Sequence, residues 1–301
     1  MTHHWGYVGA IASALLFGVG TTLNKIALSN VNPTIVAGLI YLFAGLSLLA
    51  VRFSPIHKHV MRLLKTPTKT DPKFCKKDIV TLGVVVLSGS IIAPVLFLNG
   101  LNQTTAINAS LLQNAECLFT VLIALFFLRE HCNKKEWIGI ALLIIGAVFL
   151  STNAQFYSLS LETLLLGNIL ILTACLFWGI DNNLSKFLCA KKDLLLVTAL
   201  KCLTGGTSLL LVAYALNLDF YVPLSAFPFL ISVGAFSIGF SILFFMLGLK
   251  EIGSMRTGTI FSTAPLFGAV SAFIILKEEF TWVQVTAGLV MVLGVYVLYR
   301  K

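Results

Sequence analysis

The chain has 301 residues, of which 58% are hydrophobic and 11% charged, and its mean hydropathy is +0.95. Soluble domains carry charge at about 25% of positions, so this composition excludes an ordinary soluble protein. We therefore predict an all-α integral membrane protein in a lipid bilayer. The net charge of +9 does not indicate nucleic-acid binding, because the basic residues stand between long apolar runs rather than in one patch.

Ten apolar runs predict ten transmembrane helices, because a hydrocarbon core about 30 Å thick requires roughly 20 apolar residues per helix. In chain order the predicted helices are Trp5–Lys25, Pro33–Arg52, Asp78–Asn99, Thr104–Leu128, Glu136–Asn153, Thr163–Ser185, Asp193–Leu216, Ser225–Leu249, Thr257–Leu276 and Thr281–Tyr299. The one long linker follows Arg52, and its Pro, Thr and Lys content predicts a solvated loop rather than another domain.

The distribution of cations predicts the orientation. With the N-terminus inside, most of the 21 Lys and Arg residues fall in cytoplasmic loops, whereas the outer loops around residues 151–162 and 217–222 carry none. Cytoplasmic loops are enriched in Lys and Arg, so both termini are expected in the cytoplasm. The absence of a transit-type leader favours the plasma (cell) membrane over an organelle.

Internal matches predict two repeats. Leu118-Phe119 of the fourth helix corresponds to Leu266-Phe267 of the ninth at an offset of 148, and Lys25 of the first corresponds to Lys186 of the sixth. Each half holds five helices, an odd number, so the second copy must enter the membrane from the opposite side. We expect two inverted five-helix repeats, residues 1–153 and 154–301.

Three stretches also resemble a known family. Leu16-Phe17-Gly18, the run from Ala109 to Glu116, and Arg129-Glu130 followed by Trp137-Ile138-Gly139 resemble the EamA family of the drug/metabolite transporter superfamily. The resemblance implies a ten-helix metabolite carrier, often an exporter of amino acids or related compounds. The ninth helix keeps Ala264-Pro265-Leu266-Phe267, whereas the fourth lacks the proline.

Ionisable residues at membrane depth are candidates for function. Glu116 lies near the middle of the fourth helix, while Asp181 and Lys201 lie in the sixth and seventh at depths that allow contact. The Asp181–Lys201 pair is either a clamp between helices or a substrate contact. Glu116 is either a protonated acid bonded to a backbone carbonyl or a proton site coupled to transport.

Further candidates follow from helix periodicity. A stripe with Asn108 and Glu116, and Gln113 at its margin, would line a polar cavity on the fourth helix. Phe17 and Asn24 share a face of the first helix, and Trp178 lies on the equivalent face of the sixth. Packing is the alternative for the aromatic residues, and Tyr41 would meet either substrate or a neighbouring helix.

These features favour a secondary active transporter that exports small metabolites such as amino acids by alternating access, with protons as a candidate coupling ion. An efflux carrier for drugs or organic cations is the alternative, because an acid and aromatic walls suit cations. A membrane-embedded enzyme is disfavoured, since paired catalytic groups are missing, and the inverted repeat disfavours a channel or receptor. The sequence predicts no cofactor and no metal site, and it allows a monomer or a homodimer.

Overall fold

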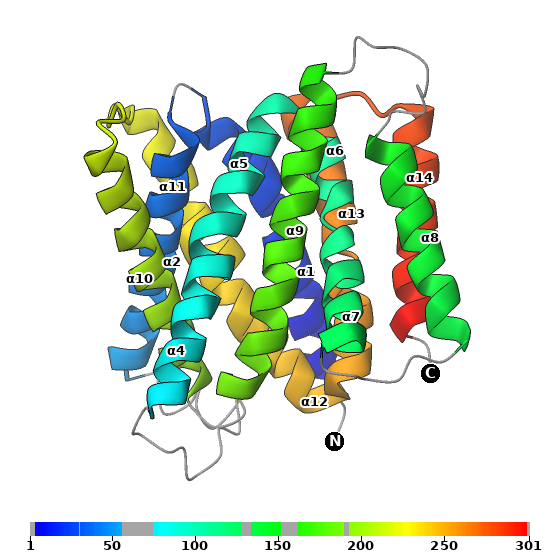
Figure 1. The fold of residues 1–301 in the computed structure, drawn as a ribbon, viewed down its shortest axis with the longest axis horizontal. Helices are drawn as coiled ribbons and strands as arrows, with labels where there is room; N and C mark the ends of the chain where they lie inside the picture. The colour runs from blue at the N-terminus through cyan, green and yellow to red at the C-terminus, as the bar shows by residue number, and fades with distance from the viewer. Residues whose placement is uncertain are drawn as a thin grey trace.

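A computed structural model describes residues 4–29, 31–55, 75–127, 134–151, 162–189 and 193–299. These ranges contain helices and turns but no strand. The long helices lie side by side, and α1 begins at the same end of the molecule at which α14 finishes (Figure 1).

The helices divide into two series. Up to residue 151 they are α1 (His4–Ala27), α2 (Pro33–Phe53), α4 (Lys76–Val85), η1 (Val86–Ile92), α5 (Ala93–Gln103), α6 (Ala106–Leu112), α7 (Ala115–Phe127) and α8 (Lys134–Ser151). They continue with α9 (Glu162–Cys189), α10 (Leu194–Ala215), η3 (Leu224–Ala226), α11 (Phe227–Ser232), η4 (Val233–Phe240), α12 (Ser241–Phe261), α13 (Ala264–Ser271), η5 (Ala272–Leu276) and α14 (Trp282–Tyr299). Stretches η1, η4 and η5 are π-helical, and η3 is a 3₁₀ turn.

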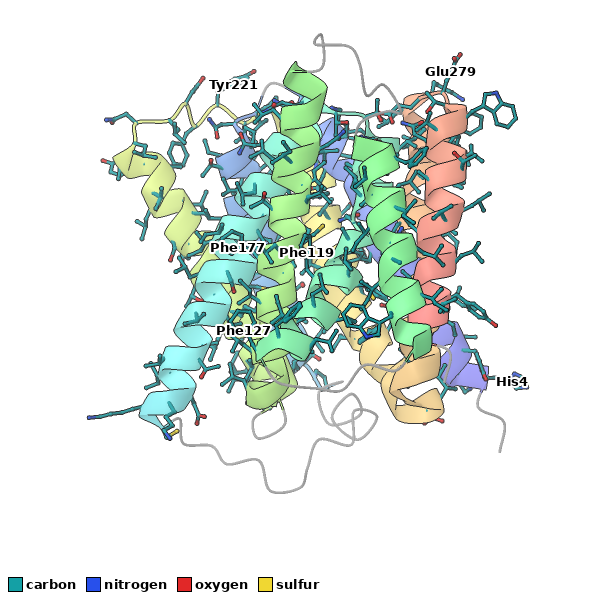
Figure 2. The ribbon with its side chains drawn as sticks, turned by 45° about the vertical axis from the view of Figure 1, so that its right-hand side comes forward. His4, Phe119, Phe127, Phe177, Tyr221 and Glu279 are labelled. Atoms are coloured by element: carbon teal, nitrogen blue, oxygen red, sulfur yellow. The ribbon has the colours of Figure 1, made fainter. Side chains whose placement is uncertain are left out.

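Six helical segments of the described residues are long and apolar enough to cross a membrane. They are His4–Ala27, Pro33–Phe53, Lys76–Gln103, Ala106–Phe127, Leu195–Ala215 and Leu224–Phe245, and three shorter apolar helices accompany them. Large apolar side chains project outward from the helices, and the labelled Tyr221 and Glu279 mark the end opposite His4 (Figure 2). An outer surface of this kind suits contact with lipid.

Helices meet in a small set of pairs: α1 packs against α12 and α13, α9 against α5 and α7, α2 against α10, and α8 against α14. Glycines allow several of these approaches. A Cβ atom on Gly206 of α10 would lie 2.6 Å from the backbone nitrogen of Leu42 on α2, and one on Gly100 would lie 2.6 Å from the carbonyl oxygen of Gly167. Small residues thus bring backbones together, as is usual in membrane helix bundles.

The fourth predicted helix is broken, which corrects the continuous Thr104–Leu128 helix expected from sequence. It consists of α6 and α7, separated by a turn at Gln113 and Asn114. Within the turn the amide of Glu116 donates to the Gln113 carbonyl at 3.0 Å, a three-residue separation that tightens the chain. The Asn114 side chain donates to the Leu111 carbonyl at 3.1 Å and so satisfies one backbone group left open at the break.

The eighth and ninth predicted helices are joined differently from the expectation. A loop was expected between Leu249 and Thr257, but α12 is helical throughout this stretch. The chain nevertheless reverses within α12, because the rings of Phe245 and Phe261 lie 4.9 Å apart, whereas a straight helix would separate them by roughly 24 Å. A turn at Ser262 and Thr263 then precedes α13.

Two charged side chains hold the turn between α5 and α6. The ammonium of Lys25 donates to the carbonyl oxygens of Leu101 at 2.6 Å and Thr104 at 2.7 Å. The carboxylate of Glu278 accepts from the amides of Ala106 and Ile107, both at 2.9 Å. A cation at a helix C-terminus and an acid at a helix N-terminus each satisfy open backbone groups, so this clamp ties α1 and the segment after η5 to one turn.

Candidate functional site

A cavity of about 510 Å³ lies between the helices of both series. This volume falls within the range of sites that bind small molecules, about 300–1,000 Å³. The cavity brings together eight residues singled out from the sequence: Phe17, Asn24, Tyr41, Gln113, Glu116, Trp178, Asp181 and Lys201.

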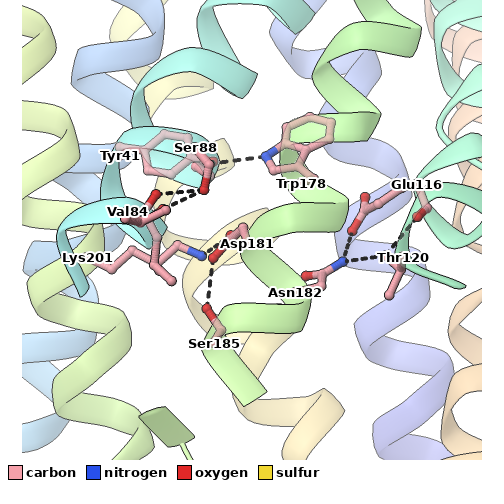
Figure 3. Close-up of polar contacts among 12 residues, drawn as sticks. Tyr41, Val84, Ser88, Glu116, Thr120, Trp178, Asp181, Asn182, Ser185 and Lys201 are labelled. Atoms are coloured by element: carbon pink, nitrogen blue, oxygen red, sulfur yellow. Dashed lines mark hydrogen bonds and ion pairs between the residues drawn. The ribbon is translucent and has the colours of Figure 1, made fainter. Parts of the chain in front are cut away.

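Asp181 and Lys201 form an ion pair between α9 and α10. The Asp181 side chain is 5% exposed and also accepts a hydrogen bond from the Ser185 hydroxyl at 2.8 Å, whereas the Lys201 side chain is 18% exposed. Figure 3 shows Asp181 between Lys201 and Ser185. The backbone of Gly89 in η1 lies against Asp181, where a Cβ atom would be 2.7 Å from the Asp181 Cβ. The carboxylate is therefore fixed on several sides.

Glu116 occupies another part of the cavity wall, at the start of α7. Its Oε1 accepts from the Asn182 side chain at 2.8 Å, and the same Asn182 amide reaches the Thr120 hydroxyl at 3.3 Å (Figure 3). No hydrogen bond to the other carboxylate oxygen, Oε2, occurs within the described residues. Glu116 therefore retains an acceptor for a proton or a cationic group in the cavity.

The carbonyl oxygen of Gly89 accepts two side-chain hydrogen bonds, from the Tyr41 hydroxyl at 3.0 Å and from the Trp178 indole at 3.2 Å. The π-helical backbone explains why this oxygen is open. The amide of Ala93 donates to the Ser88 carbonyl instead, and Pro94, five residues after Gly89, has no N–H to give. Tyr41 and Trp178 complete a hydrogen bond that the helix itself does not make.

A second polar region lies beside the break in the fourth helix. The Thr21 hydroxyl of α1 donates to the Gln113 side chain at 3.0 Å. Asn24, one turn further along α1, is 8% exposed, and its Oδ1 has no hydrogen-bond partner among the described residues. Aromatic rings flank the cavity, with Phe17 and Phe261 at 5.3 Å and Phe97 and Trp178 at 5.3 Å between ring centres.

Asn108 is the one predicted site residue that does not line the cavity. Its side chain donates to Asn168 on α9 at 2.6 Å and to Thr104 at 3.2 Å, so it joins two helices. The expected stripe from Asn108 to Glu116 assumed one continuous helix. The turn at Gln113 and Asn114 interrupts that helix, so helical periodicity does not relate the position of Asn108 to that of Glu116.

Sequence reasoning assigned no role in the site to Gly89 or Asn182. The signal for Gly89 was a proline five residues later, which leaves a carbonyl without its π-helical donor. The signal for Asn182 is its position directly after Asp181, a predicted site residue of the same helix. Within the described residues, no group of three or more His, Cys, Asp or Glu side chains could hold a metal ion; His3, His57, His59 and His131 lie outside those residues.

Comparison with known proteins gives a consistent set of similarities. The sequence profile of the EamA-like transporter family matches residues 4–152 and again residues 165–300. A protein of Methanothermobacter thermautotrophicus described as an uncharacterized transporter is 38% identical over 299 residues, which cover 99% of this chain and 87% of that protein. An Escherichia coli protein described as a probable amino-acid metabolite efflux pump is 24% identical over 208 residues, which cover 63% of this chain and 66% of that protein.

A solved structure, titled only as the crystal structure of a protein, shares this fold. The TM-score is 0.66 at 16% sequence identity, and the match covers 97% of this chain and 95% of that chain. At this identity the likeness concerns the fold alone.

Proposed function

Because the chain belongs to the EamA-like transporter family, we propose that it is a secondary active transporter that exports small metabolites such as amino acids by alternating access. The relatives are described as transporters or efflux pumps, not enzymes, and the chain is a multi-pass membrane protein with a small-molecule substrate. The observation that carries the proposal is the central cavity, which holds two acids and a lysine at membrane depth.

The proposed architecture is ten transmembrane helices in two inverted repeats, residues 1–153 and 154–301. If the two halves are exchanged, α1 takes the place of α9, and the packing of α1 on α12 and α13 becomes the packing of α9 on α5 and α7. The α2–α10 and α8–α14 pairs are the same before and after this exchange. The helix breaks support the same relation, since Asn114 and Ser262 both lie in turns and are 148 residues apart. Rocking of the two halves around the cavity would expose it to each side in turn.

The expected orientation places both termini in the cytoplasm of a cell with this protein in its plasma membrane. The common end at which α1 begins and α14 finishes is compatible with that expectation (Figure 1). The loop cations predict which side this end faces.

An amino acid suits the chemistry of the cavity. Its ammonium matches the open oxygen of Glu116, and its carboxylate matches the ammonium of Lys201. The description of the Escherichia coli relative as a probable amino-acid metabolite efflux pump agrees with this class. Protons are the proposed coupling ion, because a proton and the substrate ammonium would compete for Glu116.

Organic cations are the second candidate class. Glu116 and the aromatic rings of Phe17 and Trp178 line one cavity, and cations bind both acids and aromatic faces. The two classes differ at Lys201, since a cation without a carboxylate gains nothing from it.

Counterflow in proteoliposomes tests the function. Vesicles loaded with single unlabelled amino acids are given a labelled amino-acid mixture. Parallel vesicles loaded with unlabelled tetraphenylphosphonium are given the labelled cation, and protein-free vesicles give the background that this lipophilic cation shows on its own. The proposal expects exchange of at least one amino-acid group. Exchange of the cation alone selects the second class, and exchange of neither by folded protein refutes both. Glu116→Gln protein should lose the response of uptake to a pH gradient, and an unchanged response would remove Glu116 from proton coupling.

A further inference from the structure

The ion pair in the cavity has two unlike members. Asp181 is nearly buried, contacts the backbone of Gly89 and accepts a second hydrogen bond from Ser185. Lys201 is more exposed, and its ammonium sits at the end of a flexible four-carbon chain. Of the two groups, Lys201 is therefore the one that can move to a new partner.

The surroundings allow the pair to separate. When Lys201 leaves, Asp181 keeps the hydroxyl of Ser185 as a donor. A molecule that brings both signs leaves the net charge of the cavity unchanged. Among the described residues that line the cavity, the charged side chains are Glu116, Asp181 and Lys201, so a zwitterion adds one cation for the acids and one anion for the lysine.

We infer that Lys201 exchanges its Asp181 partner for the carboxylate of a bound α-amino acid, so that this ion pair selects zwitterionic substrates. The inference rests on the proposed function and deepens it. In the empty site Asp181 occupies the position of the substrate carboxylate as partner of Lys201. In the loaded site the substrate ammonium lies with the acids, and no covalent bond changes.

A molecule that lacks either charge should bind less tightly than an amino acid. An amino acid replaces the Lys201–Asp181 pair by contacts with all three charged groups, because its carboxylate meets Lys201 and its ammonium lies with both acids. A decarboxylated amine leaves Lys201 with Asp181 and contacts Glu116 alone. A deaminated acid takes Lys201 but leaves Asp181 without a cation, which is costly for a buried carboxylate. We therefore expect amino acids to bind more tightly than either the amines or the deaminated acids.

The test is competition during counterflow of a labelled mixture of L-alanine, L-threonine, L-leucine and L-phenylalanine. The competitors are the same unlabelled amino acids, the corresponding amines, and the corresponding deaminated carboxylic acids. With wild-type protein, amino acids should compete at concentrations about tenfold or more below either analogue. With Lys201→Met/Asp181→Asn protein, which removes both charges of the ion pair, that advantage over the amines should fall to about twofold or less.

Asp181→Asn alone should make the deaminated acids compete several-fold more strongly, because Lys201 then no longer forms its ion pair with Asp181 and no buried carboxylate is left without a cation. The matched control is Arg52→Met/Asp193→Asn, which neutralises another ion pair, between α2 and the start of α10, whose residues do not line the cavity. This control should keep the wild-type order of competitors.

Three outcomes overturn the inference. If the Lys201→Met/Asp181→Asn protein keeps the wild-type order, the pair is a clamp between helices. If the amines compete as strongly as the amino acids do when the wild-type protein is assayed, the ion pair does not recognise the substrate carboxylate. If wild-type protein exchanges none of the four amino acids, the proposed amino-acid transport itself fails. This outcome is distinct from the first two, which both require that wild-type protein exchanges amino acids.

Discussion

Gly89→Ala should destabilise the protein by disturbing the cavity wall. The added Cβ would lie 2.7 Å from the Asp181 Cβ and would also overlap the Asp181 carboxylate. Atoms this close must shift, and overpacking of a filled site costs about 1–3 kcal/mol. Since Asp181 pairs with Lys201, and the Gly89 carbonyl accepts from Tyr41 and Trp178, the shift should reach both contacts.

Gly83→Ala is the matched control, because Gly83 lies in α4, at the start of the same continuous helix, and its Cβ would meet nothing within 4 Å. In an open helical position alanine is favoured over glycine by about 0.5–1 kcal/mol. Thermal unfolding of detergent-purified protein measures both variants, with about 2–4 °C expected per kcal/mol. Gly89→Ala should unfold several degrees below wild type and Gly83→Ala at or slightly above it. Equal unfolding temperatures, with wild-type transport by Gly89→Ala, would refute the described contact.

Two other contacts give stability predictions by the same assay. Glu278→Ala removes the acceptor of two amides at the start of α6 and should lower the free energy of unfolding by about 1–2 kcal/mol. Its control, Glu279→Ala at the adjacent exposed position, should change that free energy by less than about 0.5 kcal/mol. Equal losses of stability in the two variants would argue against the clamp. Tyr41→Phe should lower the free energy of unfolding by about 0.5–1.5 kcal/mol. The double variant Tyr41→Phe/Trp178→Phe should lose more stability than the sum of the two single variants, because the Gly89 carbonyl then loses both donors. Strict additivity would contradict the shared acceptor.

The sequence predicted which residues line the cavity where the argument concerned one helix at a time. Charged groups are rare at membrane depth, so Glu116, Asp181 and Lys201 stood out, and all three line the cavity. The predicted contact between Asp181 and Lys201 is present in the structure. Periodicity along α1 likewise predicted the cavity-facing positions of Phe17 and Asn24.

The parts that were missed depend on local departures from the ideal α-helix. The turn at Gln113 and Asn114 has no proline or glycine to mark it, and it separates Asn108 from the cavity. The role of Gly89 arises because a π-helical stretch and Pro94 together leave one carbonyl open. The helical reversal between Phe245 and Phe261 occurs where charge and hydropathy indicated a loop. Each departure is set by packing against other helices, which a single-helix pattern does not contain.

The central claim is that substrate crosses the membrane through this cavity, and a steric block tests it most directly. Thr198→Trp places a large side chain in the cavity from α10, while Thr207→Trp places the same side chain at an exposed position of the same helix. Amino-acid counterflow is measured for both at matched amounts of folded protein. We expect Thr207→Trp to exchange like wild type and Thr198→Trp to lose exchange. Wild-type exchange by folded Thr198→Trp would contradict transport through the cavity.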